Sequence, residues 1–259
     1  MQFNPGFNIT LKPKKLEFEY GDGVRGPAPE FRRLNAIRPS LKDPGCTGPD
    51  PVYGIAMDVG REQDFPILKE RMLLFGAVAY ASGQLGEEPV RSQGHVHSIA
   101  PHCGWSTPEW FEIWEGTAII YAQQRTEDDP GICVAVKARV GEQVIVPPGW
   151  AHCVINADSQ NRMAFGALCD RQYAFEYAAI RRHHGLAWFP VFRNGDRITW
   201  ERNPHYNPSK LVERVARDYP ELVCRSGVPL YQQFLDSPDM VNWVSNPASM
   251  QHLWPTFIP

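Results

Sequence analysis

Two histidines at alternate positions, His95 and His97, follow a glycine in the segment GHVHS of a chain that contains 8 histidines. Side chains of an extended strand repeat every second residue, so both imidazoles point to the same face. Two adjacent nitrogen donors suit a metal ion, although an isolated His-x-His more often places two polar residues on a solvated strand face. A metal site therefore needs further ligands elsewhere in the sequence.

Two downstream segments, PEWFEIWEG and VPPGWAHCVINAD, supply candidate ligands. The first offers a carboxylate from Glu109 or Glu112, and the second offers a third imidazole from His152. Three imidazoles and one carboxylate leave coordination positions open, which suits a divalent first-row metal that also binds a substrate. Cys153 adjoins His152 but would face the other side of a strand, so we do not expect it to be a ligand.

The composition indicates a protein that acts on small molecules. The 259 residues are 43% hydrophobic and carry a net charge of -3 without a cluster of Lys and Arg, which argues against nucleic acid and acidic membranes as partners. The first residues lack the apolar stretch of a signal peptide, and the run MLLFGAVAYA is too short to span a bilayer. The 6 cysteines lack Cys-x-x-Cys spacing and are expected to be reduced thiols in a cytoplasmic protein.

The sequence pattern divides the chain into three regions. Residues 1–66 are rich in Pro and Gly and predict an irregular arm with short strands, of which PVYGIAMDV is the clearest. Residues 67–206 contain short segments rich in β-branched and aromatic residues between Gly and Pro, which predicts a barrel or sandwich. Asn-Gly within FRNGDR predicts a tight hairpin. In residues 207–259, NPSKLVERVARDYPEL predicts a helix that begins at Pro208, and VPLYQQFLDS predicts another.

The histidine, glutamate and histidine segments together resemble the two-part cupin motif. SQGHVHS, PEWFEIWEG, VPPGWAHCVINAD and FRNGDRITWERNP are similar to the cupin-type glucose-6-phosphate isomerases, and FRRLNAIRPS and DPVYGIAMDV resemble that family's N-terminal arm. The resemblance implies an all-β fold, a jelly-roll-like cupin barrel of the double-stranded β-helix type. The arm would wrap this barrel, and the C-terminal extension would be helical. Apolar strand edges and a wrapped arm make a homodimer the expected assembly.

The resemblance also assigns the ligands of one divalent ion, which could be Fe, Mn, Zn or Ni. The family's ligand glutamate precedes a hairpin glycine, and six residues separate Glu109 from Gly116. Glu112 would face the other way and is expected to be a solvated carboxylate. The implied ligand set is therefore His95, His97, Glu109 and His152. The longer segment before Glu109 adds a loop in which His102 is expected to be solvated at the rim, and His183 and His184 are expected in a basic surface cluster.

The resemblance to the family's substrate pocket is incomplete. Ser92 and Gly94 keep a hydroxyl and close backbone access where the family binds phosphate, and Tyr53 and Tyr177 match active-site tyrosines. Other hydroxyl and imidazole groups of the family are absent at three positions, namely Ala77, Phe111 and Phe175. A phosphate would then need a guanidinium, because guanidinium groups match phosphate oxygens bidentately. The candidates are Arg91, Arg71 and Arg171.

The implied activity is isomerisation of glucose 6-phosphate and fructose 6-phosphate through a cis-enediolate, a step of glycolysis and gluconeogenesis. Glu109, Tyr53 and Tyr177 would be the catalytic residues, and Ser92, Gly94 and Arg91 would bind the sugar phosphate. Three alternatives stay open: a metal cupin that isomerises or epimerises a different sugar, a cupin dioxygenase with the same ligands, and a non-catalytic sugar-binding cupin. Oxygen consumption would identify the dioxygenase.

Overall fold

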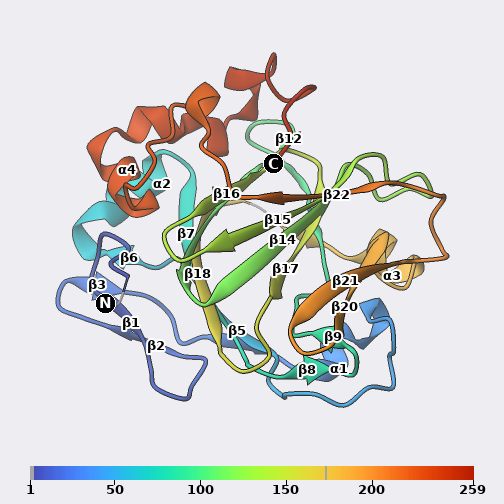
Figure 1. The fold of residues 1–259 in the computed structure, drawn as a ribbon. Coiled ribbons are helices and arrows are strands. Elements are labelled where there is room, and N and C mark those ends of the chain that lie inside the picture. Colours follow the sequence, from blue (N-terminus) through green and yellow to red (C-terminus); the bar gives the residue numbers. More distant parts are fainter. Residues whose placement is uncertain (1–2, 173) are drawn as a thin grey trace.

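The computed structural model describes residues 3–172 and 174–259, and two β-sheets that face each other form its centre (Figure 1). One sheet has six strands in the order β16-β13-β18-β7-β5-β4, and the other has four in the order β17-β14-β15-β22. The six-stranded sheet contains β4 (Glu30–Arg32), β5 (Tyr53–Met57), β7 (Leu73–Tyr80), β13 (Glu109–Glu115), β16 (Gln143–Val146) and β18 (Met163–Asp170). The four-stranded sheet contains β14 (Thr117–Gln123), β15 (Cys133–Arg139), β17 (Ala151–Asn156) and β22 (Leu211–Val215). The expected all-β fold is confirmed.

Alternating side chains of both sheets form the core between them. On β13, Phe111 and Ile113 face this core, and Ile120 and Val154 face it from the four-stranded sheet. Each of these side chains is at most 4% exposed. Burying a side chain of this size stabilises the fold by about 1.5–3 kcal/mol. The period of two along each strand therefore fixes which β13 residues point inward, and Glu109 shares that inward face.

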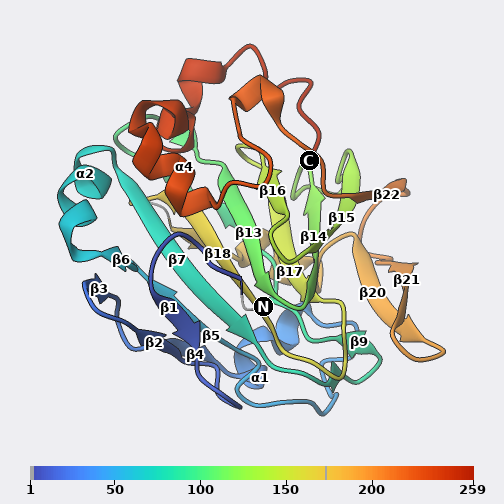
Figure 2. The same cartoon turned by 60° about the vertical axis from the view of Figure 1, so that its left-hand side comes forward.

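The N-terminal arm and the C-terminal extension cover the outer face of the six-stranded sheet (Figure 2). Phe75 of β7 contacts Phe7 of the arm at a ring-centroid distance of 5.6 Å and Tyr231 of the extension at 5.2 Å. Phe7 and Tyr231 also contact each other at 4.4 Å. The two ends of the chain thus meet on one face. The extension contains α4 (Leu230–Asp236) and the 3-10 helices η4 (Pro238–Val244) and η5 (Pro247–Met250).

A hairpin and a short helix cover the outer face of the four-stranded sheet. The hairpin pairs β20 (Trp188–Arg193) with β21 (Arg197–Arg202), and the helix is α3 (Ala178–Arg182). Asn194 and Gly195 have φ angles of 50° and 84° in the turn, which confirms the predicted hairpin. Asn and Gly tolerate this left-handed conformation better than other residues.

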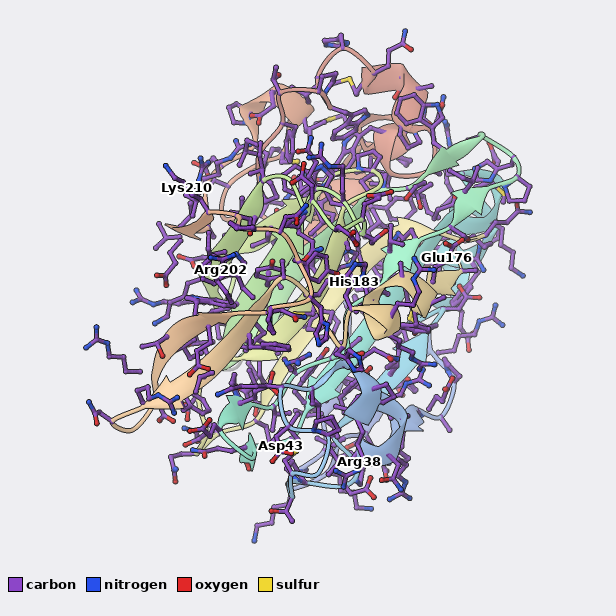
Figure 3. All side chains as sticks on the ribbon, turned by 90° about the vertical axis from the view of Figure 1, so that its right-hand side faces the viewer. Arg38, Asp43, Glu176, His183, Arg202 and Lys210 are labelled. Carbon is purple, nitrogen blue, oxygen red and sulfur yellow. The ribbon has the colours of Figure 1, made fainter. Side chains whose placement is uncertain are left out.

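His183, at the end of α3, is buried, and the expectation of a basic surface cluster is wrong for this residue. Figure 3 labels it on the side of the molecule that carries α3. Its Nε2 lies 3.0 Å from Asp128 Oδ1, its Nδ1 lies 2.9 Å from the Ala179 carbonyl oxygen, and its ring stacks on Tyr206 at 4.2 Å. His183 therefore fastens α3 to neighbouring loops.

The helix predicted from Pro208 is wrong, because residues 211–215 form β22 instead. This strand pairs in parallel with β15, with Leu211 opposite Cys133 and Val215 opposite Lys137. Valines have a low helix propensity and a high strand propensity, and β15 would otherwise be an unpaired edge. Pairing with a distant strand outweighed the helical spacing of the apolar residues.

The helices of the described residues are short, and none of them has the length and apolar character required to cross a membrane. The segment VPLYQQFLDS contains α4, as predicted. The other helices are α1 (Leu34–Ile37), η1 (Arg38–Ser40), η2 (Glu62–Asp64), α2 (Phe65–Glu70) and η3 (Pro220–Leu222). Two-stranded ladders pair β1 (Ile9–Leu11) with β2 (Phe18–Tyr20), β3 (Val24–Arg25) with β6 (Gly60–Arg61), β8 (Gln84–Leu85) with β9 (Glu88–Pro89), β10 (Val96–His97) with β19 (Phe175–Glu176), and β11 (Ile99–Ala100) with β12 (Trp105–Ser106).

Candidate metal centre

The structure brings His95, His97, Glu109 and His152 together, with one ligand atom from each lying within 4.8 Å of the others. Glu109 Oε2 lies 3.1 Å from His152 Nε2, 3.2 Å from His97 Nε2 and 3.8 Å from His95 Nε2. The His95 side chain is 15% exposed, whereas those of His97 and His152 are nearly inaccessible. Solvent therefore reaches the cluster from the His95 side.

Backbone pairing holds the ligands in place where the two sheets meet. His95 N donates to the His152 carbonyl at 3.0 Å, and His152 N donates to the His95 carbonyl at 2.9 Å. Glu109, at the first position of β13, pairs with Val146 at the last position of β16. Residues 147–150 then form the turn into β17, in which Gly149 has a φ of 79° that other residues rarely adopt. This turn carries His152 into the site.

Hydrogen bonds to backbone carbonyls orient two of the imidazoles. His97 Nδ1 lies 2.9 Å from the Thr107 carbonyl oxygen, and His152 Nδ1 lies 3.1 Å from that of Trp150. A carbonyl oxygen only accepts, so each Nδ1 donates a hydrogen bond to its carbonyl and each Nε2 is the nitrogen that faces Glu109. Metal-binding histidines are typically held by a hydrogen bond of this kind.

The charges of the cluster match those of metal ligands. Burial acts to raise the pKa of Glu109, but hydrogen bonds from the side chains of His152, His95 and His97 outweigh it and hold this pKa well below its usual range. Burial, together with the neighbouring His152, lowers the pKa of His95 to about 3. At neutral pH the carboxylate is therefore ionised and His95 is neutral, the forms that coordinate a cation. The donor set fits a divalent first-row metal.

Glu112 points away from the cluster, as strand alternation predicted, but it is buried and not solvated. It is 0% exposed. Its carboxylate accepts hydrogen bonds from Leu230 N at 2.7 Å, Gln143 Nε2 at 2.9 Å and Trp114 Nε1 at 3.0 Å. The C-terminal extension covers this face of β13, which the local sequence pattern did not reveal. Burial raises the pKa of Glu112 to about 7, although the three donors act to lower it.

Aromatic rings lie against the cluster on two sides, beside His95 and beside His152. The Phe175 ring lies 4.1 Å from the His95 ring, and the Tyr177 ring lies 6.3 Å from it. The Phe111 ring lies 5.8 Å from that of His152. Tyr177 places a hydroxyl-bearing ring beside the cluster, whereas the two phenylalanines contribute an apolar wall that limits the access of water.

Ser92, Gly94 and Arg91 lie in the strand-like segment before His95. Ser92 Oγ accepts a hydrogen bond from Val154 N at 3.1 Å. Gly94 has a φ of 87°, and a Cβ atom there would lie 2.8 Å from Leu186 Cδ1. The Arg91 guanidinium is 2% exposed, and its Nη2 lies 2.6 Å from Glu88 Oε1. Packing alone thus accounts for the glycine, and the arginine is held by a buried ion pair.

The other two arginines named from the sequence are also paired. Arg71 Nη1 lies 2.6 Å from Asp239 Oδ1, and Arg171 Nη2 lies 2.7 Å from Asp58 Oδ1. Ala77 packs in the outer cluster of the six-stranded sheet with Phe75, whereas its neighbour Val78 faces the inner core. The Ala77 side chain therefore faces the outer cluster, away from the candidate metal ligands.

His102 is an exposed residue of the loop, as expected, but its ring is also held by other segments. Its Nε2 lies 3.0 Å from the Ser245 carbonyl oxygen and 3.2 Å from Asp170 Oδ2, and its Nδ1 lies 3.2 Å from Gln172 Oε1. These contacts join the loop inserted after His97 to the C-terminal extension. Packing between segments far apart in the sequence produces these contacts of the His102 ring, and nothing in the sequence around His102 indicated them.

Arg32 is a residue beside the site that sequence reasoning missed. It lies on β4 opposite Tyr53 of β5, and a side-chain hydrogen bond links the two residues. Its Nε is buried without a hydrogen-bond partner among the residues that the structure describes. The one available signal was the FRR segment of the arm, which pairing with the PVYGIAMDV strand brings next to Tyr53.

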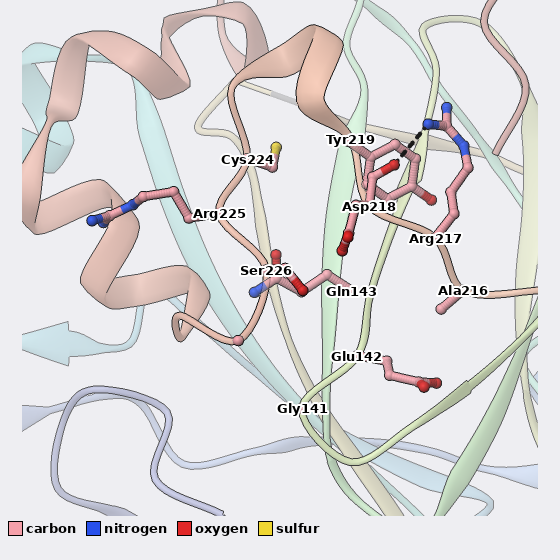
Figure 4. A pocket seen from close by; sticks show the side chains of 11 residues that line it. Gly141, Glu142, Gln143, Ala216, Arg217, Asp218, Tyr219, Cys224, Arg225 and Ser226 are labelled. Carbon is pink, nitrogen blue, oxygen red and sulfur yellow. Dashed lines mark hydrogen bonds between the residues drawn. The ribbon is translucent and has the colours of Figure 1, made fainter.

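A separate cavity of about 290 Å³ lies between the β15–β16 turn and the C-terminal extension (Figure 4). Its lining includes Gln143, which is at the end of β16 opposite to Val146 and hence remote from Glu109. The guanidinium of Arg217 pairs with Glu221 at 2.6 Å, and that of Arg225 pairs with Asp236 at 2.6 Å. Both cations of this cavity are therefore already neutralised.

Comparison with known proteins adds one family match. A family model described as Glucose-6-phosphate isomerase (GPI) matches residues 38–209. No curated protein matches the sequence. Solved structures that align include oxalate decarboxylase from Bacillus subtilis, at 16% identity and a TM-score of 0.35 over 51% of this chain and 28% of that one. Vicilin from Corylus avellana aligns at 11% identity and a TM-score of 0.37, over 50% of this chain and 33% of that one. Procruciferin from Brassica napus aligns at 10% identity and a TM-score of 0.36, over 48% of this chain and 27% of that one. The chain spans a third or less of each.

Proposed function

Because this chain belongs to the cupin-type glucose-6-phosphate isomerase family, we propose that it is a metal-dependent isomerase that interconverts glucose 6-phosphate and fructose 6-phosphate. The observation that carries this proposal is the ionised Glu109 carboxylate facing three imidazoles, two of which are oriented toward it by hydrogen bonds from Nδ1 to backbone carbonyls. A cupin with a candidate metal site of this kind can hold both oxygens of an α-hydroxy carbonyl sugar on one side.

The reaction moves one proton between two carbons. A base removes the proton from carbon 2 of the open-chain aldose, the electron pair forms the enediolate, and a proton is returned to carbon 1 to give the ketose. A bound divalent metal would supply Lewis acidity, which stabilises negative charge on the two oxygens. Glu109, which its depressed pKa keeps ionised at neutral pH, would exchange that proton.

Tyr53 and Tyr177 would hydrogen-bond the sugar oxygens and help to transfer protons between them. Burial raises the pKa of both hydroxyls, so they stay protonated at neutral pH and donate hydrogen bonds to sugar oxygens. Phe175 and Phe111 would shield the enediolate from water because they stand against His95 and His152. Shielding of this kind favours return of the proton over loss of the intermediate.

A second candidate is the same chemistry on a different sugar, and the two phenylalanines favour it. The resemblance implies a histidine at the position of Phe175 and a tyrosine at that of Phe111. A substrate with fewer polar groups at those points would suit this pocket better. The homodimer and the three-region division of the chain stay predictions.

The test is an isotope experiment on metal-loaded protein. The protein is incubated in heavy water with glucose 6-phosphate, fructose 6-phosphate and a panel of other phosphorylated and free sugars, with His97→Ala as the metal-free control. Deuterium at carbon 2 of glucose 6-phosphate, absent with the control, supports the proposal. Deuterium in another sugar alone would identify that sugar as the substrate in place of glucose 6-phosphate. Oxygen consumption without exchange would indicate a dioxygenase. Sugar binding without exchange or oxygen consumption would indicate a non-catalytic binding protein.

A further inference from the structure

Arg32 stands beside two tyrosines, Tyr53 and Tyr177, and the second of these lies next to a candidate metal ligand. The β4–β5 register places it directly opposite Tyr53, whose ring stacks on that of Tyr80 at 4.8 Å. It also interacts electrostatically with Tyr177, whose ring lies 6.3 Å from the His95 ring. Tyr177 therefore neighbours both the guanidinium and the metal cluster.

The guanidinium of Arg32 is only partly neutralised. Glu30 Oε1 lies 3.2 Å from its Nη2, but the Glu30 side chain is 72% exposed and that of Arg32 is 24% exposed. Arg32 Nε is buried and has no hydrogen-bond partner among the described residues. A buried donor without a partner costs free energy unless something accepts from it, and an oxyanion is the natural acceptor for a guanidinium edge.

The arginines that the sequence suggested for this task are engaged elsewhere. Arg91 pairs with Glu88 and Arg171 with Asp58, at 2.6 and 2.7 Å. Arg71 Nε is also buried without a hydrogen-bond partner among the described residues, but the Arg71 guanidinium pairs at 2.6 Å with Asp239 of the C-terminal extension. Ser92, the hydroxyl that the family resemblance assigns to phosphate, contacts Tyr80, and Tyr80 stacks on Tyr53 next to Arg32. A chain of contacts thus leads from Ser92 through Tyr80 and Tyr53 to the guanidinium.

We propose that Arg32 binds the oxyanion of the substrate and determines its preference for phosphorylated sugars, with the hydroxyls of Tyr53 and Tyr177 beside it. This inference rests on the proposed function, because that function supplies a sugar phosphate. The reacting carbons lie at the metal cluster, and the phosphate end of the chain extends past Tyr177 to Arg32. The guanidinium takes the place of the threonine hydroxyl that this chain lacks.

Arg32→Gln tests the assignment, and Arg33→Gln is the matched control because Arg33 is the adjacent residue and its side chain is 61% exposed. We expect Arg32→Gln to raise KM for fructose 6-phosphate and the inhibition constant of inorganic phosphate by about ten- to hundredfold, with a smaller change in kcat. Arg32→Lys should recover part of the loss, since lysine keeps the charge without the bidentate edge. Values for Arg32→Gln that match those for Arg33→Gln would overturn the inference.

Glu30→Gln gives a second test that does not depend on a destabilising change. This exposed substitution removes the carboxylate that competes for Arg32, so phosphate should bind severalfold more tightly. Unchanged or weaker binding would count against the inference.

If the parent isomerises no fructose 6-phosphate, the proposed function fails by itself. The role of Arg32 is then tested by comparing the Tm of each protein in inorganic phosphate with its Tm in chloride at equal ionic strength. A rise in Tm for the parent and Arg33→Gln, but not for Arg32→Gln, supports the anion site, and equal shifts overturn it.

Discussion

Glu109 and Glu112 lie three residues apart on β13 with their carboxylates on opposite faces of the sheet. Glu109 Oε2 lies 3.1 Å from His152 Nε2 among the candidate metal ligands, whereas Glu112 accepts a hydrogen bond from Leu230 N at 2.7 Å beneath the C-terminal extension. One short strand therefore carries a carboxylate that is a candidate metal ligand and another carboxylate that binds the C-terminal extension. The two can be changed separately because side chains alternate along a strand.

Metal content should distinguish the two carboxylates. We expect Glu109→Gln to lower the divalent metal bound by the purified protein at least tenfold, since a ligand charge is lost. Glu112→Gln should bind as much metal as the parent. Elemental analysis after reconstitution measures the metal content of both variants. A loss of metal confined to the Glu112 variant would show that Glu112, and not Glu109, is the carboxylate ligand.

His97→Ala should remove the metal and leave the fold intact. The ring loses its Nε2 ligand atom, but packing of the two sheets rather than one ion supplies most of the stability of a chain of this size. Elemental analysis and far-UV circular dichroism of the same sample check the two halves of this prediction. A metal stoichiometry equal to that of the parent would exclude His97 from the ligand set.

Stability should fall with rising pH because of Glu112. Burial raises the pKa of its carboxyl from 4.5 to about 7 in the folded protein. The folded state then binds the proton more tightly than the unfolded state, so the contribution is complete below pH 4.5 and is lost as the pH rises through about 7. The loss is on the order of 3 kcal/mol.

Urea unfolding of the parent and Glu112→Gln at several pH values from 4.5 to 8 measures this contribution. The difference in the free energy of unfolding between the two proteins should change with pH, because other carboxyls contribute equally to both. A difference that is constant across this range would show that Glu112 does not titrate as described.

Phe175→His should raise the turnover of fructose 6-phosphate. The Phe175 ring lies 4.1 Å from that of His95, so an imidazole there adds a group that can transfer protons between the sugar oxygens and solvent. We expect an increase in kcat of about tenfold or more. The measurement is steady-state turnover at saturating metal, and equal or lower turnover would mean that the phenylalanine suits the natural substrate.

Ala77→Thr is the matched control for that gain. Ala77 is 0% exposed and packs on the outer side of β7 with Phe75, so its side chain faces away from the cluster. The larger residue should lower the free energy of unfolding by about 1–3 kcal/mol and leave KM unchanged. Thermal unfolding and KM for fructose 6-phosphate measure the two effects. A lower KM would place this position in the pocket after all.

The sequence alone determined the parts of the site that depend on local spacing. His95 and His97 share a face because strands have a period of two, and the same rule separated Glu109 from Glu112. The central strands β5, β7 and β13 to β18 and the hairpin at Asn194 also followed from local composition, because β-branched runs and positive φ angles are properties of a few neighbouring residues.

Only the tertiary structure decided the features that depend on distant partners. Residues 211–215 pair with β15 instead of forming a helix, and Glu112 is buried because α4 begins above it. Arg91 is held by Glu88, while Arg32 reaches the pocket because β4 pairs with β5. Each outcome is a contact between two distant segments. The packing of the whole chain sets how such segments lie relative to each other, and the spacing of residues within one segment does not encode that packing.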